Sequence, residues 1–192
     1  MRIGLFFGSF NPIHVGHLII ANFFAEHTDL DRVWLVVSPH NPLKKKSTLA
    51  RDYDRLHLVE LATADNDRLF PSRVEFDLPK PSYTVDTLAH LHEHYPQHDF
   101  TLLMGGDSLA SLPKWKNYEQ LLERNRIYVY QRPGYELPEE LARHPSVRLF
   151  EAPLMQISAS FVRACIREGR SVRYLLTEPV HQYLESSHLY RS

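Results

Sequence analysis

The sequence predicts an α/β fold built on a doubly wound parallel sheet. Short apolar runs of strand length alternate with segments of helical periodicity along all 192 residues. Strands separated by helices are typical of right-handed βαβ units, whose sheets are parallel. No linker, repeat or low-complexity tract interrupts this alternation. We therefore expect residues 1–192 to form a single domain, a size that suffices to bury a core.

Each predicted strand is a short apolar run that ends at a polar or turn-forming residue. The first run ends at Gly8, for example, and a later one ends at Gly105 and Gly106. The predicted strands cover residues 3–7, 32–37, 74–76, 100–104, 127–130 and 147–150. The predicted helices, where apolar residues recur at helical spacing, cover residues 15–26, 50–64, 85–94, 118–123, 160–168 and 179–185.

Composition and charge exclude several classes of protein. Hydrophobic residues make up 43% and charged residues 23% of the chain, as in ordinary globular domains, so disorder is not expected. The net charge of −1 gives no general reason to expect nucleic acid or an anionic membrane as a partner. The first apolar run is too short for a signal peptide, and no run approaches the ~20 residues of a membrane span. We expect a cytoplasmic protein.

Neither the single cysteine nor the twelve histidines predict a metal site. Cys165 cannot form an internal disulfide and is expected to be a small buried residue on a helix. His90 and His94 would share a helical face and so allow weak transition-metal binding, but no acidic or cysteine partner lies in a fixed pattern near them. The histidines on polar stretches are expected to be solvated: His27, His57, His90, His144, His181 and His188.

The unusual residue clusters all begin just after predicted strands. They start at Gly8, Ser38, Gly105 and Arg132. Because ligands bind beyond the carboxyl ends of the strands in such sheets, this coincidence indicates a site at that end. The least regular stretches, residues 39–49 and 66–81, are candidate substrate loops.

The cluster from Gly8 to His17 carries the clearest chemistry. Gly8 permits close approach of a ligand to the backbone, and Pro12 stiffens a turn that leads into a helix N-terminus, where anions bind. His14 and His17 are three residues apart and can face one ligand, with Gly16 leaving space for a base or ribose. Two imidazoles at a helix N-terminus suit phosphoryl or nucleotidyl transfer. An ordinary strand-to-helix turn would explain Gly8 but not the paired histidines.

This cluster resembles the nucleotidyltransferase superfamily marked by G-x-F-x-P-x-H-x-G-H. The matching residues are Gly8, Phe10, Pro12, His14, Gly16 and His17. The resemblance implies a Rossmann-like nucleotidyltransferase fold with C-terminal helices. It also implies that both histidines contact the ATP phosphates and stabilise in-line attack at the α-phosphorus without a covalent intermediate. The other ATP-binding residues that it implies in this cluster are Gly8, Ser9, Phe10 and Gly16. Mg²⁺ would accompany ATP as cofactor, and pyrophosphate would leave.

A second cluster places hydroxyls and a cation at the start of a later helix. Ser158 or Ser160 alone would be explained as helix caps. Arg163 is less easily explained there, because a cation beside a helix N-terminus is unfavourable unless an anion binds. The segment resembles the superfamily signature I-S-x-T-x-x-R, with Ser160 in place of threonine. The resemblance implies that Ile157, Ser158, Ser160 and Arg163 hold ATP, with Arg163 among the catalytic residues.

A lysine run, Lys44 to Lys46, follows the second predicted strand. Such a run is commonly a solvated surface feature. The resemblance implies that one basic residue of this loop reaches the phosphates, and both Lys44 and Lys45 remain candidates for that catalytic role.

Three further segments concern the acceptor. Residues 81–88 begin a helix with exposed amides, a second potential anion site. Asp107 follows a predicted strand and is placed to accept ribose hydroxyls. Trp115 stands between Lys114 and Lys116, which favours a surface position where its ring can stack. The alternatives are that Trp115 anchors the core and that the threonines of residues 81–88 simply cap their helix.

Together these segments resemble the bacterial nicotinate mononucleotide adenylyltransferases. The shared patterns are S-Y-T-x-x-T-L, G-x-D-x-L with a following tryptophan, and residues 132–135 and 176–180. The resemblance implies that Trp115 stacks on the pyridine ring and that amides near Thr84 bind its carboxylate. It assigns Gly105 and Asp107 to the ATP half. The remaining acceptor-binding residues that it implies are Asn41, Tyr83 and Arg132.

The substrates predicted from this resemblance are ATP and nicotinate mononucleotide. Three alternatives remain open. Phosphopantetheine adenylyltransferases share the first signature but are shorter and lack the S-Y-T and D-x-L…W combination. A nicotinamide acceptor differs from nicotinate by a full charge, and the sequence does not reveal which donors discriminate between them. A nucleotide-binding sensor domain could use the same fold without catalysis. The resemblance also leaves a homodimer open.

Overall fold

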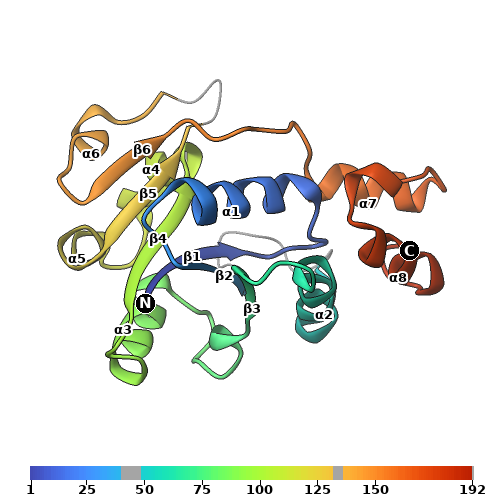
Figure 1. Cartoon of the computed structure of the whole chain (residues 1–192), viewed down its shortest axis with the longest axis horizontal. Helices are drawn as coiled ribbons and strands as arrows, with labels where there is room; N and C mark the ends of the chain where they lie inside the picture. The colour runs from blue at the N-terminus through green and yellow to red at the C-terminus, as the bar shows by residue number, and fades with distance from the viewer. Residues whose placement is uncertain (40–48, 132–135, 192) are drawn as a thin grey trace.

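Six parallel strands form one sheet in the order β3-β2-β1-β4-β5-β6 (Figure 1). The computed structural model describes residues 1–39, 49–131 and 136–191. The chain moves outward from β1 to one edge, returns to pair β4 with β1, and then moves to the other edge, which is the order of a classic Rossmann sheet. The predicted fold class is confirmed. The strands are β1 Arg2–Gly8, β2 Arg32–Val37, β3 Leu69–Ser72, β4 Asp99–Gly105, β5 Arg126–Tyr130 and β6 Val147–Phe150.

Helices connect the strands and cover both faces of the sheet. The α-helices are α1 Val15–His27, α2 Asp52–Thr63, α3 Thr84–His94, α4 Gly106–Ser111, α5 Tyr118–Arg124, α6 Glu139–Ala142, α7 Ala159–Arg167 and α8 Glu178–Ser186. Short 3-10 turns occur at η2 Val74–Phe76, η3 Leu112–Lys114 and η4 Arg173–Leu175. The α1 and α3 helices lie on opposite sides of the sheet (Figure 1).

Two hydrophobic cores lie on the two faces, because successive strand residues point to opposite sides. On one face, Phe6 of β1 belongs to the same core as Phe24 of α1 and Val59 of α2. On the other face, Leu5 of β1 shares a core with Leu91 of α3. This two-sided burial is what a doubly wound sheet requires, and it explains why the strands read as continuous apolar runs.

The C-terminal helices extend the first core beyond the sheet. In Figure 1, α7 and α8 lie at the right-hand end of the molecule, near α2. Val180 and Leu184 of α8 are buried in the core that α1 and α2 also line, and Cys165 of α7 is buried there as predicted. His181 was expected to be solvated, but it is 7% exposed because it lies three residues before Leu184 on the packed side of the helix. Among the described residues, no helix is long and apolar enough to cross a membrane.

The strand predicted at residues 74–76 is wrong. These residues form a 3-10 turn, in which the Phe76 amide donates a hydrogen bond to the Arg73 carbonyl at 2.8 Å. The strand lies earlier, at Leu69–Ser72, and contains Pro71. Proline is accepted there because β3 is at the edge of the sheet, where its missing N–H interrupts no pairing. The short α4 and α6 helices are too brief for their periodicity to predict.

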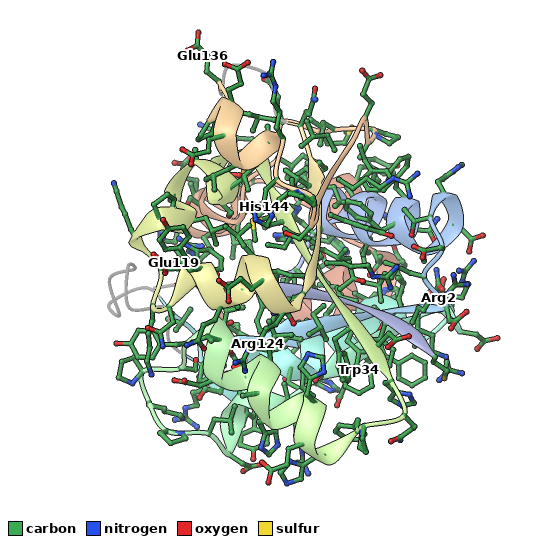
Figure 2. All side chains as sticks on the ribbon, turned by 90° about the vertical axis from the view of Figure 1, so that its left-hand side faces the viewer. Arg2, Trp34, Glu119, Arg124, Glu136 and His144 are labelled. Atoms are coloured by element: carbon green, nitrogen blue, oxygen red, sulfur yellow. The ribbon has the colours of Figure 1, made fainter. Side chains whose placement is uncertain are left out.

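An ion network joins the strands at their amino ends. Figure 2 views this end, with Arg2 and Trp34 on the near side. Asp29, in the loop before β2, accepts hydrogen bonds from the Tyr128 hydroxyl, from Arg126 at 2.8 Å and from Arg2 at 3.3 Å. The Tyr128 hydrogen bond and the two arginines hold the pKa of Asp29 below its ordinary value, against the effect of its partial burial. The network ties the loop to β1 and β5, opposite the predicted site.

Candidate functional site

The segments predicted to carry function meet at the carboxyl end of the sheet. The turn between β1 and α1 is held to the end of β2 by the Ser38 amide, which donates to the Gly8 carbonyl at 2.9 Å. Gly105 ends β4, the strand paired with β1 on its other side. This is the point where the strand order reverses, and such points bind ligands in open α/β sheets.

The first turn depends on a glycine because a phenylalanine ring folds beneath it. A Cβ atom on Gly8 would lie 2.7 Å from the ring of Phe10. Phe10 is 1% exposed and has a φ of 41°, an unfavourable conformation that the surrounding core maintains. The Phe10 side chain therefore belongs to the core, and only its backbone is available for the predicted contact with ATP.

The paired histidines form one stacked unit at the start of α1. Their ring centroids lie 3.7 Å apart with planes inclined by 23°. The Nδ1 of His17 accepts the backbone N–H of His14 at 3.3 Å. A neutral imidazole that accepts at Nδ1 carries its proton on Nε2, which makes Nε2 of His17 a donor. A Cβ on Gly16 would lie 3.1 Å from His14 Nδ1, so the space beside Gly16 is bordered by the His14 ring, and the expected room for a base or ribose is reduced.

The start of α7 docks onto the β1–α1 turn through Arg163. Its Nη1 donates to the Asn11 carbonyl at 2.7 Å, across 152 residues of sequence, and its Nη2 donates to Ser160 Oγ at 3.2 Å. The Nε of Arg163 is buried and has no hydrogen-bond partner within the described part of the chain. Burial lowers the pKa of Arg163 from its ordinary value. The two predicted ATP signatures are thus side by side.

The two serines of this segment have different local roles. Ser158 caps α7, because its Oγ accepts the Phe161 amide at 3.1 Å, as the capping alternative requires. Ser160 instead contacts Arg163. Ile157 lies beside the start of α1, with its Cβ 3.9 Å from the position of a Cβ on Gly16.

Arg55 of α2 is a buried arginine that the sequence did not single out. Its side chain is 0% exposed. It donates to the backbone carbonyls of Ser9 at 2.5 Å, Ser38 at 2.9 Å and Ala50 at 3.1 Å, and it pairs with Asp52 at 2.8 Å. Arg55 therefore holds the ends of β1 and β2 and the start of α2 together. An arginine on an amphipathic helix is ordinarily solvated, so the sequence contained no signal for this role.

The predicted acceptor segment begins α3 with an open helix end. Tyr83 is the N-cap residue and makes no side-chain capping bond. The amides of Asp86 and Thr87 donate hydrogen bonds to the Tyr83 carbonyl. The preceding amides, those of Thr84 and Val85, lie at the start of the helix and have no intrahelical acceptor. The capping alternative is wrong for Thr87, whose hydroxyl donates to Glu75 at 2.8 Å and to the Tyr83 carbonyl at 3.2 Å.

Trp115 lies close to this helix end. It follows η3, and its half-buried side chain packs against the second core, so the core-anchor alternative is correct in part. The neighbouring Lys116 pairs with Asp86 at 2.8 Å and lies 4.9 Å from the centre of the Tyr83 ring. These contacts bring Tyr83 and Trp115, both predicted to bind the acceptor, to one place. The indole Nε1 is buried and has no hydrogen-bond partner among residues that the structure describes.

Gly105 and Asp107 form a third corner of the site. Asp107 lies in the first turn of α4. A Cβ on Gly105 would lie 2.5 Å from Asp107 Oδ1 and 3.1 Å from the Tyr130 hydroxyl oxygen, so glycine lets both groups close over the end of β4. A carboxylate at the end of a central strand is suitably placed to accept a hydrogen bond from a ribose hydroxyl. This role of Asp107 remains a prediction.

Four predicted site residues, Asn41, Lys44, Lys45 and Arg132, lie outside the described residues. Within the described ranges, no group of three or more His, Cys, Asp or Glu side chains could hold a metal ion. His90 and His94 do stack, with ring centroids 4.0 Å apart.

The chain is similar to a known protein family and to named relatives over most of its length. The cytidylyltransferase-like family model matches residues 5–165. The chain is 54% identical to a probable nicotinate-nucleotide adenylyltransferase of Flavobacterium johnsoniae over the whole of both chains, and 45% identical to one of Bacteroides thetaiotaomicron, with 96% of this chain and 91% of the relative covered.

Solved structures resemble the fold. A Plasmodium falciparum nicotinic acid mononucleotide adenylyltransferase complexed with NaAD superposes with a TM-score of 0.82 at 18% identity, covering 98% of this chain and 97% of the other. A putative nicotinate-nucleotide adenylyltransferase from Vibrio parahaemolyticus gives 0.73 at 20% identity, covering 100% and 96%. At these identities the likeness concerns the fold alone.

Proposed function

Because the chain belongs to the cytidylyltransferase-like family, we propose that it transfers the adenylyl group of ATP to nicotinate mononucleotide, giving nicotinate adenine dinucleotide and pyrophosphate. This reaction is a step of NAD biosynthesis. Relatives that bear this activity in their names align with the chain over its full length. The observation on this chain that carries the proposal is the docking of Arg163 on Asn11, which joins the paired histidines to the start of α7.

The chemistry would be a direct in-line displacement. A phosphate oxygen of the acceptor attacks the α-phosphorus of ATP, a new P–O bond forms, and the bond to pyrophosphate breaks. The protein's contribution to such a step is positioning and charge stabilisation. His17 would donate from Nε2 to the phosphate oxygens, with the N-terminal amides of α1 adding positive potential. Arg163, Ser160 and one of Lys44 and Lys45 would complete the phosphate site.

The acceptor half rests on the open end of α3 and on Trp115. A carboxylate on the pyridine ring would accept hydrogen bonds from the amides near Thr84, where no side chain caps the helix. The ring itself would stack on Trp115 beside Tyr83. Amide donors favour a carboxylate over a carboxamide through its full charge, so this geometry supports nicotinate as the acceptor.

Several finer points remain proposals. Mg²⁺ would arrive with ATP and be held mainly by phosphate oxygens and water, which is its usual mode in nucleotide enzymes. It would supply charge neutralisation on the triphosphate. The single domain of residues 1–192, the cytoplasmic location and the homodimer remain predictions. The burial of Val180 and Leu184 in the common core supports the first of these.

An acceptor screen tests the proposal. The protein would be incubated with ATP, Mg²⁺ and one of nicotinate mononucleotide, nicotinamide mononucleotide or phosphopantetheine, and pyrophosphate release would be followed. We expect fastest turnover with nicotinate mononucleotide. Preference for phosphopantetheine would overturn the acceptor assignment, and no turnover with any acceptor would leave the nucleotide-binding sensor as the better reading.

A further inference from the structure

Glu75 is a buried carboxylate that the proposed chemistry does not use. It lies in η2 and is 2% exposed. Its two oxygens accept different hydroxyls: Ser82 donates to Oε2 at 3.1 Å and Thr87 donates to Oε1 at 2.8 Å. A buried carboxylate is costly unless it is hydrogen-bonded, so these contacts account for how the fold tolerates it.

The two hydroxyls stand on either side of the acceptor segment. Ser82 precedes Tyr83 and Thr84, and Thr87 follows them within the first turn of α3. Thr87 also donates to the Tyr83 carbonyl at 3.2 Å. Both ends of the turn that would receive the pyridine carboxylate are therefore held by Glu75.

The same carboxylate is fixed to the part of the sheet that carries the ATP half of the site, because η2 follows β3 and Ser72 of β3 pairs with Val36 of β2. Burial raises the pKa of Glu75, while hydrogen bonds from the side chains of Ser38, Thr87 and Ser82 oppose that rise. Ser38 directly follows β2, and its amide donates to the Gly8 carbonyl at 2.9 Å. Glu75 thus joins the start of α3 to strands β3 and β2, and the residue after β2, Ser38, is hydrogen-bonded to the Gly8 turn.

We propose that Glu75 is a positioning residue that sets where the acceptor-binding turn of α3 lies relative to the ATP-binding turn at Gly8. The inference rests on the proposed function, because it concerns the acceptor of that reaction. In-line transfer requires the acceptor phosphate to sit against the α-phosphorus, and a displacement of about 1 Å between reacting groups can cost on the order of 10²-fold in rate.

The test is steady-state kinetics of Glu75→Gln with each substrate varied in turn. Glutamine keeps the shape of the side chain but offers only one acceptor oxygen, so one of the two hydroxyls loses the acceptor to which it donates. We expect the KM for nicotinate mononucleotide to rise about tenfold. The KM for ATP should stay within about twofold, since the histidines and Arg163 are untouched. Thr87→Val should show the same split. The double variant should be less impaired than the sum of the two single variants, because both changes act on the Glu75–Thr87 hydrogen bond.

Thr63→Val is the matched control. Thr63 is a buried threonine on α2 whose hydroxyl also donates to the carbonyl four residues earlier, Val59, at 2.9 Å. The Thr63→Val variant should lose about as much unfolding free energy as Thr87→Val and leave both KM values unchanged. If Glu75→Gln fails to fold, Thr87→Val and Ser82→Ala carry the test alone.

The outcomes separate the two proposals. An unchanged acceptor KM in the folded variants, or an equal rise in both KM values, would overturn the positioning role while wild-type turnover of nicotinate mononucleotide kept the proposed function. Absence of turnover by the wild-type protein would overturn both.

Discussion

Arg55→Lys should strongly destabilise the protein although it preserves the charge. Arg55 is 0% exposed and spreads its donors over three directions: Nε to Ala50, Nη1 to Ser9 and Ser38, and Nη2 to Asp52. A lysine ammonium concentrates its donors at one atom and cannot reproduce this fork. We expect at least two of the carbonyls to lose their partner.

The magnitude follows from the cost of an unsatisfied buried group, about 1–3 kcal/mol each. Two such losses suggest a fall of about 3 kcal/mol in the free energy of unfolding. For a chain of this length, each kcal/mol lowers Tm by about 2–4 °C, so the shift in Tm should be about 10 °C. Because Ser9 and Ser38 border the proposed ATP site, the KM for ATP should rise as well.

Urea unfolding followed by circular dichroism measures the stability change, with Arg68→Lys as the matched control. Arg68 also donates to backbone carbonyls, those of Leu30 at 2.6 Å and Asp31 at 3.2 Å, but its side chain is 35% exposed. Water can donate to these carbonyls in place of the guanidinium, so we expect Arg68→Lys to lower the free energy of unfolding by less than about 1 kcal/mol. Equal losses in the two variants would refute the reasoning, since burial of the guanidinium would then make no difference.

Three further predictions concern other parts of the molecule. His17→Ala should lower turnover on the order of 10²- to 10³-fold while the protein stays folded, and near-normal turnover would contradict its charge-stabilising role. Trp115→Ala should raise the KM for nicotinate mononucleotide about tenfold, whereas an unchanged acceptor KM would leave Trp115 as a core anchor alone. Asp29→Asn should flatten the acid dependence of stability. The lowered pKa of Asp29 means that its ionised form stabilises the fold fully above its ordinary value of 3.8, and that this contribution is lost as the pH falls through the lowered value. The urea midpoint of the wild-type protein should therefore fall more between pH 6 and pH 3 than that of the variant, and parallel curves would contradict the assignment.

Local pattern was sufficient for most of the fold. The periodicity of apolar residues located β2 and β6 at their observed bounds and most other elements to within two residues. It failed at β3, where Pro71 argues against a strand unless the strand is known to lie at an edge. Edge position is a property of strand order, which a short window of sequence does not contain.

Short motifs likewise identified the His14–His17 pair, the Arg163 segment and the start of α3, because each is a contiguous run whose chemistry can be read from spacing. The tertiary structure alone decided what the buried charges do. Arg55 and Glu75 look like ordinary polar residues in their local context, and their partners come from segments as far as 46 and 12 residues away. Whether a charged side chain is solvated or buried depends on which backbone carbonyls and hydroxyls the packed elements bring to it. That is decided only when the sheet, α2 and α3 have come together.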